Sequence, residues 1–169
     1  HFSLALTALI FVMALLGGLV AGIRAGLAYN TFPLMNGHWV PPDFLALEPW
    51  YSNFFNNMAT VQFDHRLIAW LLAGLIPWFW WRSTRIPLTS LERLWCSALP
   101  VVMTLKFGLG VMTPLWAGPV ALGAAHQAGA LLLLTTALMV NHQLLETTGN
   151  QQPGSALREP TVTRATAAA

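Results

Sequence analysis

The chain has 169 residues, of which 56% are hydrophobic and only 8% are charged, and its net charge is +2. Soluble domains carry roughly 25% charged residues, so this composition excludes an ordinary soluble fold and indicates an integral protein of the lipid bilayer. The basic residues are scattered and form no basic stripe, which argues against nucleic acid as a partner.

Four apolar segments are long enough to cross a bilayer as helices. The first carries no charge, the third opens on a Thr-x-x-Glu capping box that ends at Glu92, and the fourth follows Pro119, a residue favoured in the first turn. We therefore expect an all-α integral membrane fold. Its predicted form is a four-transmembrane-helix bundle over residues 1–145, with spans at 2–23, 59–81, 90–114 and 119–145.

The arginines predict the orientation of these spans. Arg82, Arg85 and Arg93 lie in or beside the short link between the second and third spans, whereas the long loop 27–58 contains no Lys or Arg. By the positive-inside rule the link is cytoplasmic, the loop lies outside, and both chain ends are inside. The tail 146–169 lacks hydrophobic periodicity and is predicted to be a disordered cytoplasmic segment.

Two histidines lie inside predicted spans that enter the membrane from the same side. His65 falls about six residues into the second span and His126 about seven residues beyond Pro119, so both lie roughly 10 Å below the outer helix ends. Intramembrane imidazoles at one depth suggest a shared ligand, of which heme iron is the commonest. Cys96 is the single cysteine, so any heme is bound without a Cys-x-x-Cys-His attachment.

Small residues near these histidines favour close packing around them. Gly123, Gly129 and Ala130 flank His126 on its helix, and Ala69 and Ala73 follow His65. They leave room for the edge of a ring. The alternative is simple helix packing through small side chains, which is also how Gly108 and Gly110 of the third span are interpreted.

Four charged residues are further candidates for binding a cofactor. Arg24 and Arg66 lie at the outer ends of the first two spans, where they would neutralise heme propionates; the alternatives are snorkelling or a pair with Asp64. Asp64 is also a candidate partner for an imidazole N–H. Lys106 lies in the middle of the third span and should face the bundle interior, bind a carbonyl or propionate, or mark a quinone path.

Three motifs, taken in order, resemble the heme A synthase family: GGLVAGIRAGLAYNTFPLM (17–35), VQFDHR (61–66) and AAHQAGALLLL (124–134). Members of that family are eight-helix proteins made of two related four-helix halves, each with a histidine pair. The resemblance is to the C-terminal half and implies a non-covalent heme b held between His65 and His126. One departure is Lys106, where the family usually has glutamine.

The resemblance also implies an activity, which is oxidation of a methyl group of heme O to the formyl group of heme A for terminal oxidases. The implied partners are heme O, an N-terminal half with its own histidine pair, and a quinol or another electron donor. The implied location is the bacterial inner (plasma) membrane. Two axial histidines leave no open iron position and favour electron transfer. The alternatives are a bis-histidine cytochrome b acting only in electron transfer, and a heme-free membrane scaffold or transporter half.

Overall fold

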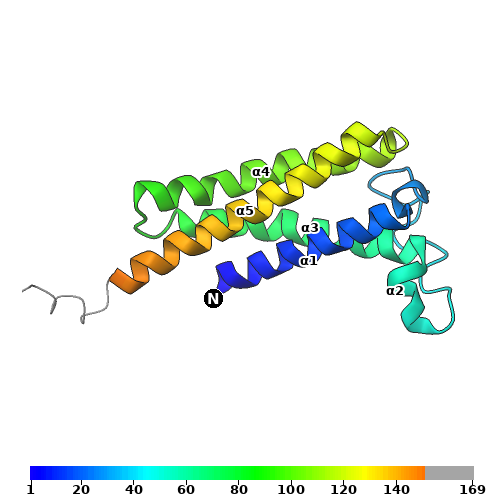
Figure 1. The fold of residues 1–169 in the computed structure, drawn as a ribbon, viewed down its shortest axis with the longest axis horizontal. Helices are drawn as coiled ribbons and strands as arrows, with labels where there is room; N and C mark the ends of the chain where they lie inside the picture. The colour runs from blue at the N-terminus through cyan, green and yellow to red at the C-terminus, as the bar shows by residue number, and fades with distance from the viewer. Residues whose placement is uncertain (151–169) are drawn as a thin grey trace, which may run out of the picture.

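The computed structural model describes residues 1–150, with side chains through Glu146. Four long helices run side by side along the molecule (Figure 1): α1 (Phe2–Gly22), α3 (Met58–Ser83), α4 (Ser90–Leu115) and α5 (Val120–Asn150). Helix α1 packs against α3 and α5, and α4 packs against the same two helices, so α3 and α5 lie diagonally across the bundle. The all-helical prediction is confirmed for residues 1–150, where no β-strand forms.

The helix bounds agree with the predicted ones to within two residues, except at the end of α5. The predicted capping box is present, since the Thr89 N–H donates to Glu92 Oε2 (2.7 Å) and the Glu92 N–H donates to Thr89 Oγ1 (3.3 Å). Helix α5 continues to Asn150, five residues past the predicted end of the fourth span at residue 145. No proline occurs between Pro119 and Pro153 to stop it. Residues 151–169, where most of the predicted tail falls, lie outside the described residues.

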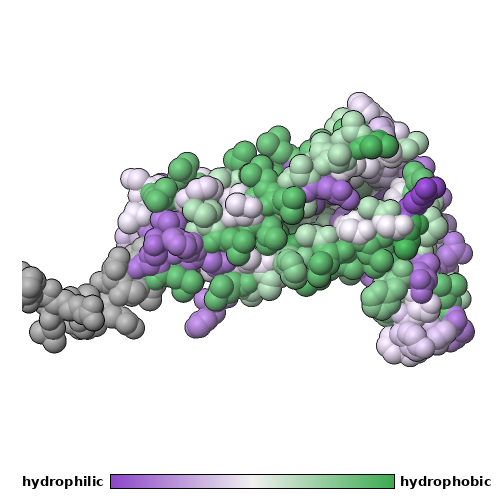
Figure 2. All heavy atoms as spheres, in the orientation of Figure 1, coloured by the Kyte–Doolittle hydropathy of each residue, from purple (hydrophilic) through white to green (hydrophobic). Residues whose placement is uncertain are grey.

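Three of the described helices, α1, α4 and α5, are long and apolar enough to cross a membrane. Helix α3 is as long as α4 but more polar, because it carries Gln62, Asp64 and Arg66 within two turns. Figure 2 shows hydrophobic side chains over most of the visible face of the bundle, with hydrophilic ones mainly toward its two ends. These three helices therefore support the prediction of an integral membrane protein. The fourth span and the two-repeat architecture stay predictions.

The connection from α1 to α3 is folded by hydrogen bonds of asparagine side chains. It contains η1 (Ala25–Leu27), η2 (Trp50–Ser52) and the one-turn helix α2 (Asn53–Asn56). The fully buried Asn53 amide donates to the Leu47 and Trp50 carbonyls at 2.7 and 2.8 Å. Asn57 then caps α3, because its Oδ1 accepts from the N–H groups of residues 59 and 60. This network fixes where α3 begins, and so the depth of His65.

The two ends of the bundle are filled differently. An apolar core from all four long helices fills the half away from the α1–α3 connection, and its buried members are Leu6, Ile10, Met13, Leu72, Ile76, Leu99, Met103, Leu133 and Ala137. Within this half, Asn141 of α5 donates to Thr7 Oγ1 of α1 at 2.6 Å. The other half contains a pocket, which this core borders through Met13, Leu72, Met103 and Leu133.

Candidate functional site

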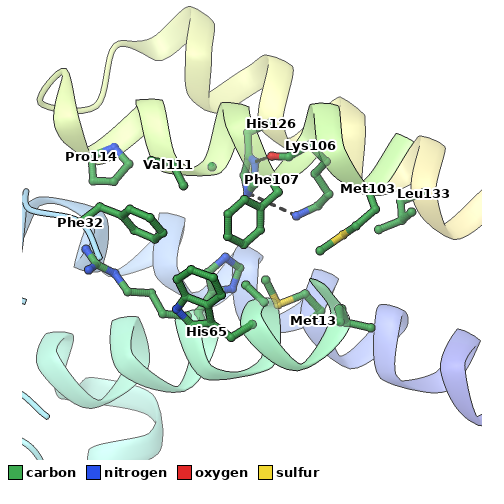
Figure 3. A pocket seen from close by; sticks show the side chains of 15 residues that line it. Met13, Phe32, His65, Met103, Lys106, Phe107, Val111, Pro114, His126 and Leu133 are labelled. Atoms are coloured by element: carbon green, nitrogen blue, oxygen red, sulfur yellow. Dashed lines mark hydrogen bonds between the residues drawn. The ribbon is translucent and has the colours of Figure 1, made fainter. Parts of the chain in front are cut away.

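A pocket lies between the long helices, toward the end where the α1–α3 connection lies, and its empty space of about 580 Å³ includes space open to the outside. Both candidate histidines line it, His65 from α3 and His126 from α5 (Figure 3). They lie seven and six residues past the first residues of their helices, so the predicted match in depth is confirmed. Their helices lie diagonally across the bundle, and both rings line the pocket between the helices.

The two imidazoles face each other across this pocket. Their ring centroids are 6.4 Å apart and their planes are inclined by 75°. A metal–imidazole bond is about 2.0–2.1 Å and a ring nitrogen lies about 1 Å from the ring centre, so imidazoles on opposite sides of one ion have centres roughly 6–6.5 Å apart. The observed separation matches two axial ligands of one metal.

The ring of His126 is oriented by the backbone of α4. Its Nδ1 lies 3.1 Å from the Lys106 carbonyl oxygen. A carbonyl only accepts, so Nδ1 carries the proton and Nε2 presents its lone pair to the pocket. A hydrogen bond from the distal nitrogen to a carbonyl is the usual support of a metal-binding histidine. The Lys106 amine lies 3.4 Å from Nε2, the position that a metal ion would take.

The ring of His65 is held differently. It packs toward α1, where a Cβ added at Gly17 would lie 3.3 Å from its Cε1. Its Nδ1 is buried and has no hydrogen-bond partner among the described residues. This nitrogen lies 4.0 Å from the same added Cβ, so the unpaired atom is on the edge of the ring that faces α1.

These residues fit an iron porphyrin once the Lys106 amine has moved from Nε2. Within residues 1–150 no cluster of three or more His, Cys, Asp or Glu side chains is placed to hold a bare metal ion. An ion held by two imidazoles must bring its remaining ligands with it, as a porphyrin does. The lining is mainly apolar and aromatic, as a flat macrocycle requires: Met13, Phe32, Ala69, Trp70, Leu72, Met103, Phe107, Val111, Pro114 and Leu133.

The structure separates the four charged candidates. Lys106 is buried and lines the pocket, as expected for an intramembrane lysine facing the interior. Arg66 also lines the pocket, but its guanidinium donates to the carbonyls of Tyr29 and Thr31 at 2.8 and 2.9 Å. These bonds, and not an ion pair with Asp64, are what hold it. Its contact with a propionate stays a prediction.

Arg24 and Asp64 do not belong to the pocket. Arg24 is exposed, adopts a left-handed conformation (φ 57°) after the end of α1, and is not part of the pocket lining. Asp64 is adjacent to His65 along α3 but lies off the pocket as well. Adjacent helical residues point about 100° apart, which places the carboxylate on another face. Direct contact of either residue with a group in the pocket is therefore not supported by this geometry.

Sequence reasoning missed an aromatic cluster at the pocket. Phe32 of the α1–α3 connection stacks on Trp70 of α3, with centroids 5.4 Å apart, and both rings meet Phe107 of α4 edge-on at 6.1 and 5.3 Å. Trp70 lies five residues past His65 on α3, and Phe107 directly follows Lys106 on α4, so neither has the i, i+3 or i, i+4 spacing that would have indicated it. The place of Phe32 depends on how the connection folds, which residue spacing does not indicate.

Comparison with known proteins places this site in a family. The family model described as cytochrome oxidase assembly protein (COX15-CtaA) matches residues 1–138. The heme A synthase of Nitrosospira multiformis is 60% identical over 144 residues, covering 85% of this chain and 40% of that protein. The human heme A synthase COX15 is 40% identical over 136 residues, covering 80% of this chain and 33% of that protein.

The heme A synthase of Nitrosomonas eutropha is 56% identical and again is matched over 40% of its length. The chain thus spans about two fifths of the length of these bacterial relatives. No solved structure shows significant similarity to it. The resemblance carried by the three motifs is confirmed, and this chain belongs to the cytochrome oxidase assembly protein family COX15-CtaA.

Proposed function

We propose that this chain forms the heme-holding four-helix unit of a heme A synthase, with heme b bound between His65 and His126. The observation that carries the proposal is the 6.4 Å separation of two imidazole rings facing each other in one pocket. The names of the relatives support the reaction, which is oxidation of a heme O methyl group to the formyl group of heme A. The assignment to the C-terminal half rests on the motifs alone.

Electron transfer is the chemistry that a heme held by His65 and His126 would supply when bound. The residues of the chain prepare for it. The Lys106 carbonyl holds the His126 proton on Nδ1 and so keeps Nε2 unprotonated. Arg66 fixes the connection at residues 29–31, which brings Phe32 to the mouth of the pocket. The apolar lining keeps water from the ring faces.

The remaining parts of the proposal concern the substrate, the partner half, the electron donor and the membrane location. Heme O is the proposed substrate, and a second four-helix half with its own histidine pair is the proposed partner that binds it. A quinol or another donor would supply electrons. The proposed location is the bacterial plasma membrane, with the α1–α3 connection outside and residues 84–89 inside. The arginines beside that link and their absence from residues 27–58 support this orientation.

The test is the absorption spectrum of the purified chain after titration with heme. The proposal expects a low-spin b-type spectrum in the unaltered protein and its loss in His126→Ala. The matched control is His142→Ala on the same helix, because His142 is exposed and pairs with Glu146 at 3.5 Å. An unchanged low-spin spectrum in His126→Ala would refute the assignment, and equal loss in both variants would mean general damage to α5.

A second experiment separates the synthase from the two alternatives. The chain is expressed, with and without the N-terminal half of a relative, in cells that lack their own heme A synthase, and extracted hemes are separated by chromatography. Heme A only in the combined cells supports the proposal. A b-type spectrum without heme A in either case favours a plain electron-carrying cytochrome. No heme in the purified protein favours a scaffold.

A further inference from the structure

One glycine of α4 lies directly against the ring of His126. A Cβ added at Gly110 would stand 2.7 Å from Cε1 and 3.2 Å from Nδ1 of this imidazole. The optimum separation of two carbon atoms is about 3.5–4.0 Å, so no side chain fits at position 110 while the ring keeps its place. The requirement for glycine here is a close approach between α4 and the imidazole of α5.

The ring is held against α4 by a hydrogen bond, so it cannot move away from Gly110 without losing that bond. Its Nδ1 donates to the carbonyl of Lys106, which lies one helical turn before Gly110 on the same face of α4. The imidazole thus packs against the backbone of α4 at Gly110, where no side chain intervenes, and donates to the Lys106 carbonyl one turn earlier. A methyl group at position 110 would push the ring off the carbonyl.

A second contact, in which a glycine of α5 faces a side chain of α4, is less tight. Gly129 of α5 lies against Lys106, where an added Cβ would be 3.5 Å from the lysine Cβ and Cγ. That distance is ordinary van der Waals contact. The tight fit between α4 and α5 is therefore concentrated at Gly110 and His126, the residue whose orientation the proposed function needs.

We infer that Gly110 is a positioning residue for His126: by leaving a notch in α4 it lets Nδ1 bond to the Lys106 carbonyl and so aims Nε2 into the pocket. Gly17 of α1 leaves room for the His65 ring with a looser fit, since its added Cβ would meet Cε1 at 3.3 Å. This inference rests on the proposed function, because it concerns how the two proposed ligands are oriented toward a heme.

The two positions are not equivalent. A shift of the His126 ring would break its hydrogen bond to the Lys106 carbonyl, whereas His65 Nδ1 has no partner within the described structure. A methyl group at position 17 would fit after a shift of the His65 ring by only a few tenths of an ångström. Substitution at 110 should therefore do much more than substitution at 17.

The chain offers a matched control for each glycine. An added Cβ at Gly108, two residues from Gly110 in α4, meets nothing within 4 Å, and the same holds for Gly18 beside Gly17. The experiment compares Gly110→Ala with Gly108→Ala, and Gly17→Ala with Gly18→Ala, in the full chain. Each purified protein is titrated with hemin, and the ferric complex is examined by electron paramagnetic resonance, which reports the relative orientation of the axial imidazoles.

The expected result for Gly110→Ala is a loss of heme affinity of about 10–100-fold, the usual effect of removing a partner that orients a metal ligand. Its resonance spectrum should shift at low field relative to the unaltered protein. Gly108→Ala and Gly18→Ala should match the unaltered protein. Gly17→Ala should shift the spectrum with a smaller loss of affinity.

A third background separates ligand positioning from helix packing. In His126→Gly, added free imidazole takes the place of the side chain and is not tethered to α5. Adding Gly110→Ala to this background should leave the imidazole-supported heme affinity unchanged, whereas damage to helix packing would lower it here too.

The outcomes distinguish the inference from the proposed function. If the unaltered protein gives no low-spin heme spectrum, the proposed function fails and the inference fails with it. If it does, but Gly110→Ala behaves as Gly108→Ala, only the inference is overturned. If Gly110→Ala does not elute as a folded species by gel filtration, the comparison of Gly17→Ala with Gly18→Ala tests the inference instead. Identical resonance spectra from these two variants would overturn the inference.

Discussion

Lys106 engages both ring nitrogens of His126, its carbonyl oxygen lying 3.1 Å from Nδ1 and its amine 3.4 Å from Nε2. The first contact supports a metal ligand and the second competes with the metal, because Nε2 has one lone pair to offer. One residue thus both orients the proposed ligand and covers its binding atom. The side chain and the backbone of Lys106 can be separated by substitution.

Lys106→Met should raise heme affinity. The variant keeps the backbone carbonyl and removes the amine that must leave Nε2, and breaking one long hydrogen bond costs roughly 1 kcal/mol, or about fivefold in affinity. Hemin titration measures this, with Leu105→Met, an exposed neighbour on α4, as the control. A lower affinity in Lys106→Met would mean instead that the amine helps to bind the porphyrin.

Arg66→Gln should loosen the connection at the pocket mouth. Its guanidinium donates to the carbonyls of Tyr29 and Thr31, and bonds from charged donors contribute about 1.5–3 kcal/mol each in favourable cases. Hydrogen exchange of residues 28–35, followed by mass spectrometry, should become faster. Arg24→Gln is the control and should leave both exchange and heme binding unchanged, because Arg24 is exposed and off the pocket. A loss of heme in Arg24→Gln would restore it as a propionate ligand.

Asn57→Ala should destabilise the start of α3. Asn57 Oδ1 accepts from the N–H groups of residues 59 and 60, and loss of such a cap typically costs about 1 kcal/mol, up to about 2 kcal/mol. Its Nδ2 also donates to the Asp43 carbonyl and to Asn53 Oδ1, at 2.8 and 2.9 Å. The midpoint of thermal unfolding should fall. The neighbouring exposed Asn56, which donates only to Ser52 Oγ at 3.1 Å, gives the matched variant Asn56→Ala, and an equal fall there would contradict the assignment.

The α1–α3 connection should become less stable at high pH. Burial, together with the 3.0 Å hydrogen bond from the Tyr29 hydroxyl to Asp43, raises the pKa of Tyr29 above its ordinary value of about 10. The folded state therefore favours the neutral phenol. This contribution is complete below pH 10 and is lost as pH rises through the raised pKa, because a phenolate would face the Asp43 carboxylate.

Thermal unfolding followed between pH 8 and pH 11 tests this dependence. The unaltered protein should lose stability above about pH 10. Tyr29→Phe should be less stable at pH 8, since the hydrogen bond is gone, but should lack this part of the pH dependence. Parallel curves for the two proteins would show that Tyr29 does not contribute.

The helices of the bundle were predictable from local patterns. Uninterrupted apolar length, a capping box at Thr89 and Glu92, and Pro119 before α5 are signals that depend on near neighbours only. They placed most helix ends within two residues. The end of α5 was misplaced because polar composition after Leu145 was taken as the end of the helix, although no residue there prevents helical geometry.

The charged candidates show where sequence reasoning stopped. Arg24 and Arg66 looked equivalent, since each lies at the outer end of a span. Only the folded connection distinguishes them, because it brings backbone carbonyls to Arg66 and leaves Arg24 exposed. Gly108 and Gly110 were also indistinguishable in sequence, and only the packing of α5 makes Gly110 the one against an imidazole.

The sequence by itself determined that this is an all-helical membrane chain with two imidazoles at matching depth. Those properties follow from apolar length, loop charge and a fixed rise per residue, all of which are counted along the chain. Tertiary structure decided that the two rings face each other at 6.4 Å and that Lys106 lies at one of them. Such contacts depend on the rotation and spacing of helices distant in sequence, which side-chain packing sets and residue spacing does not.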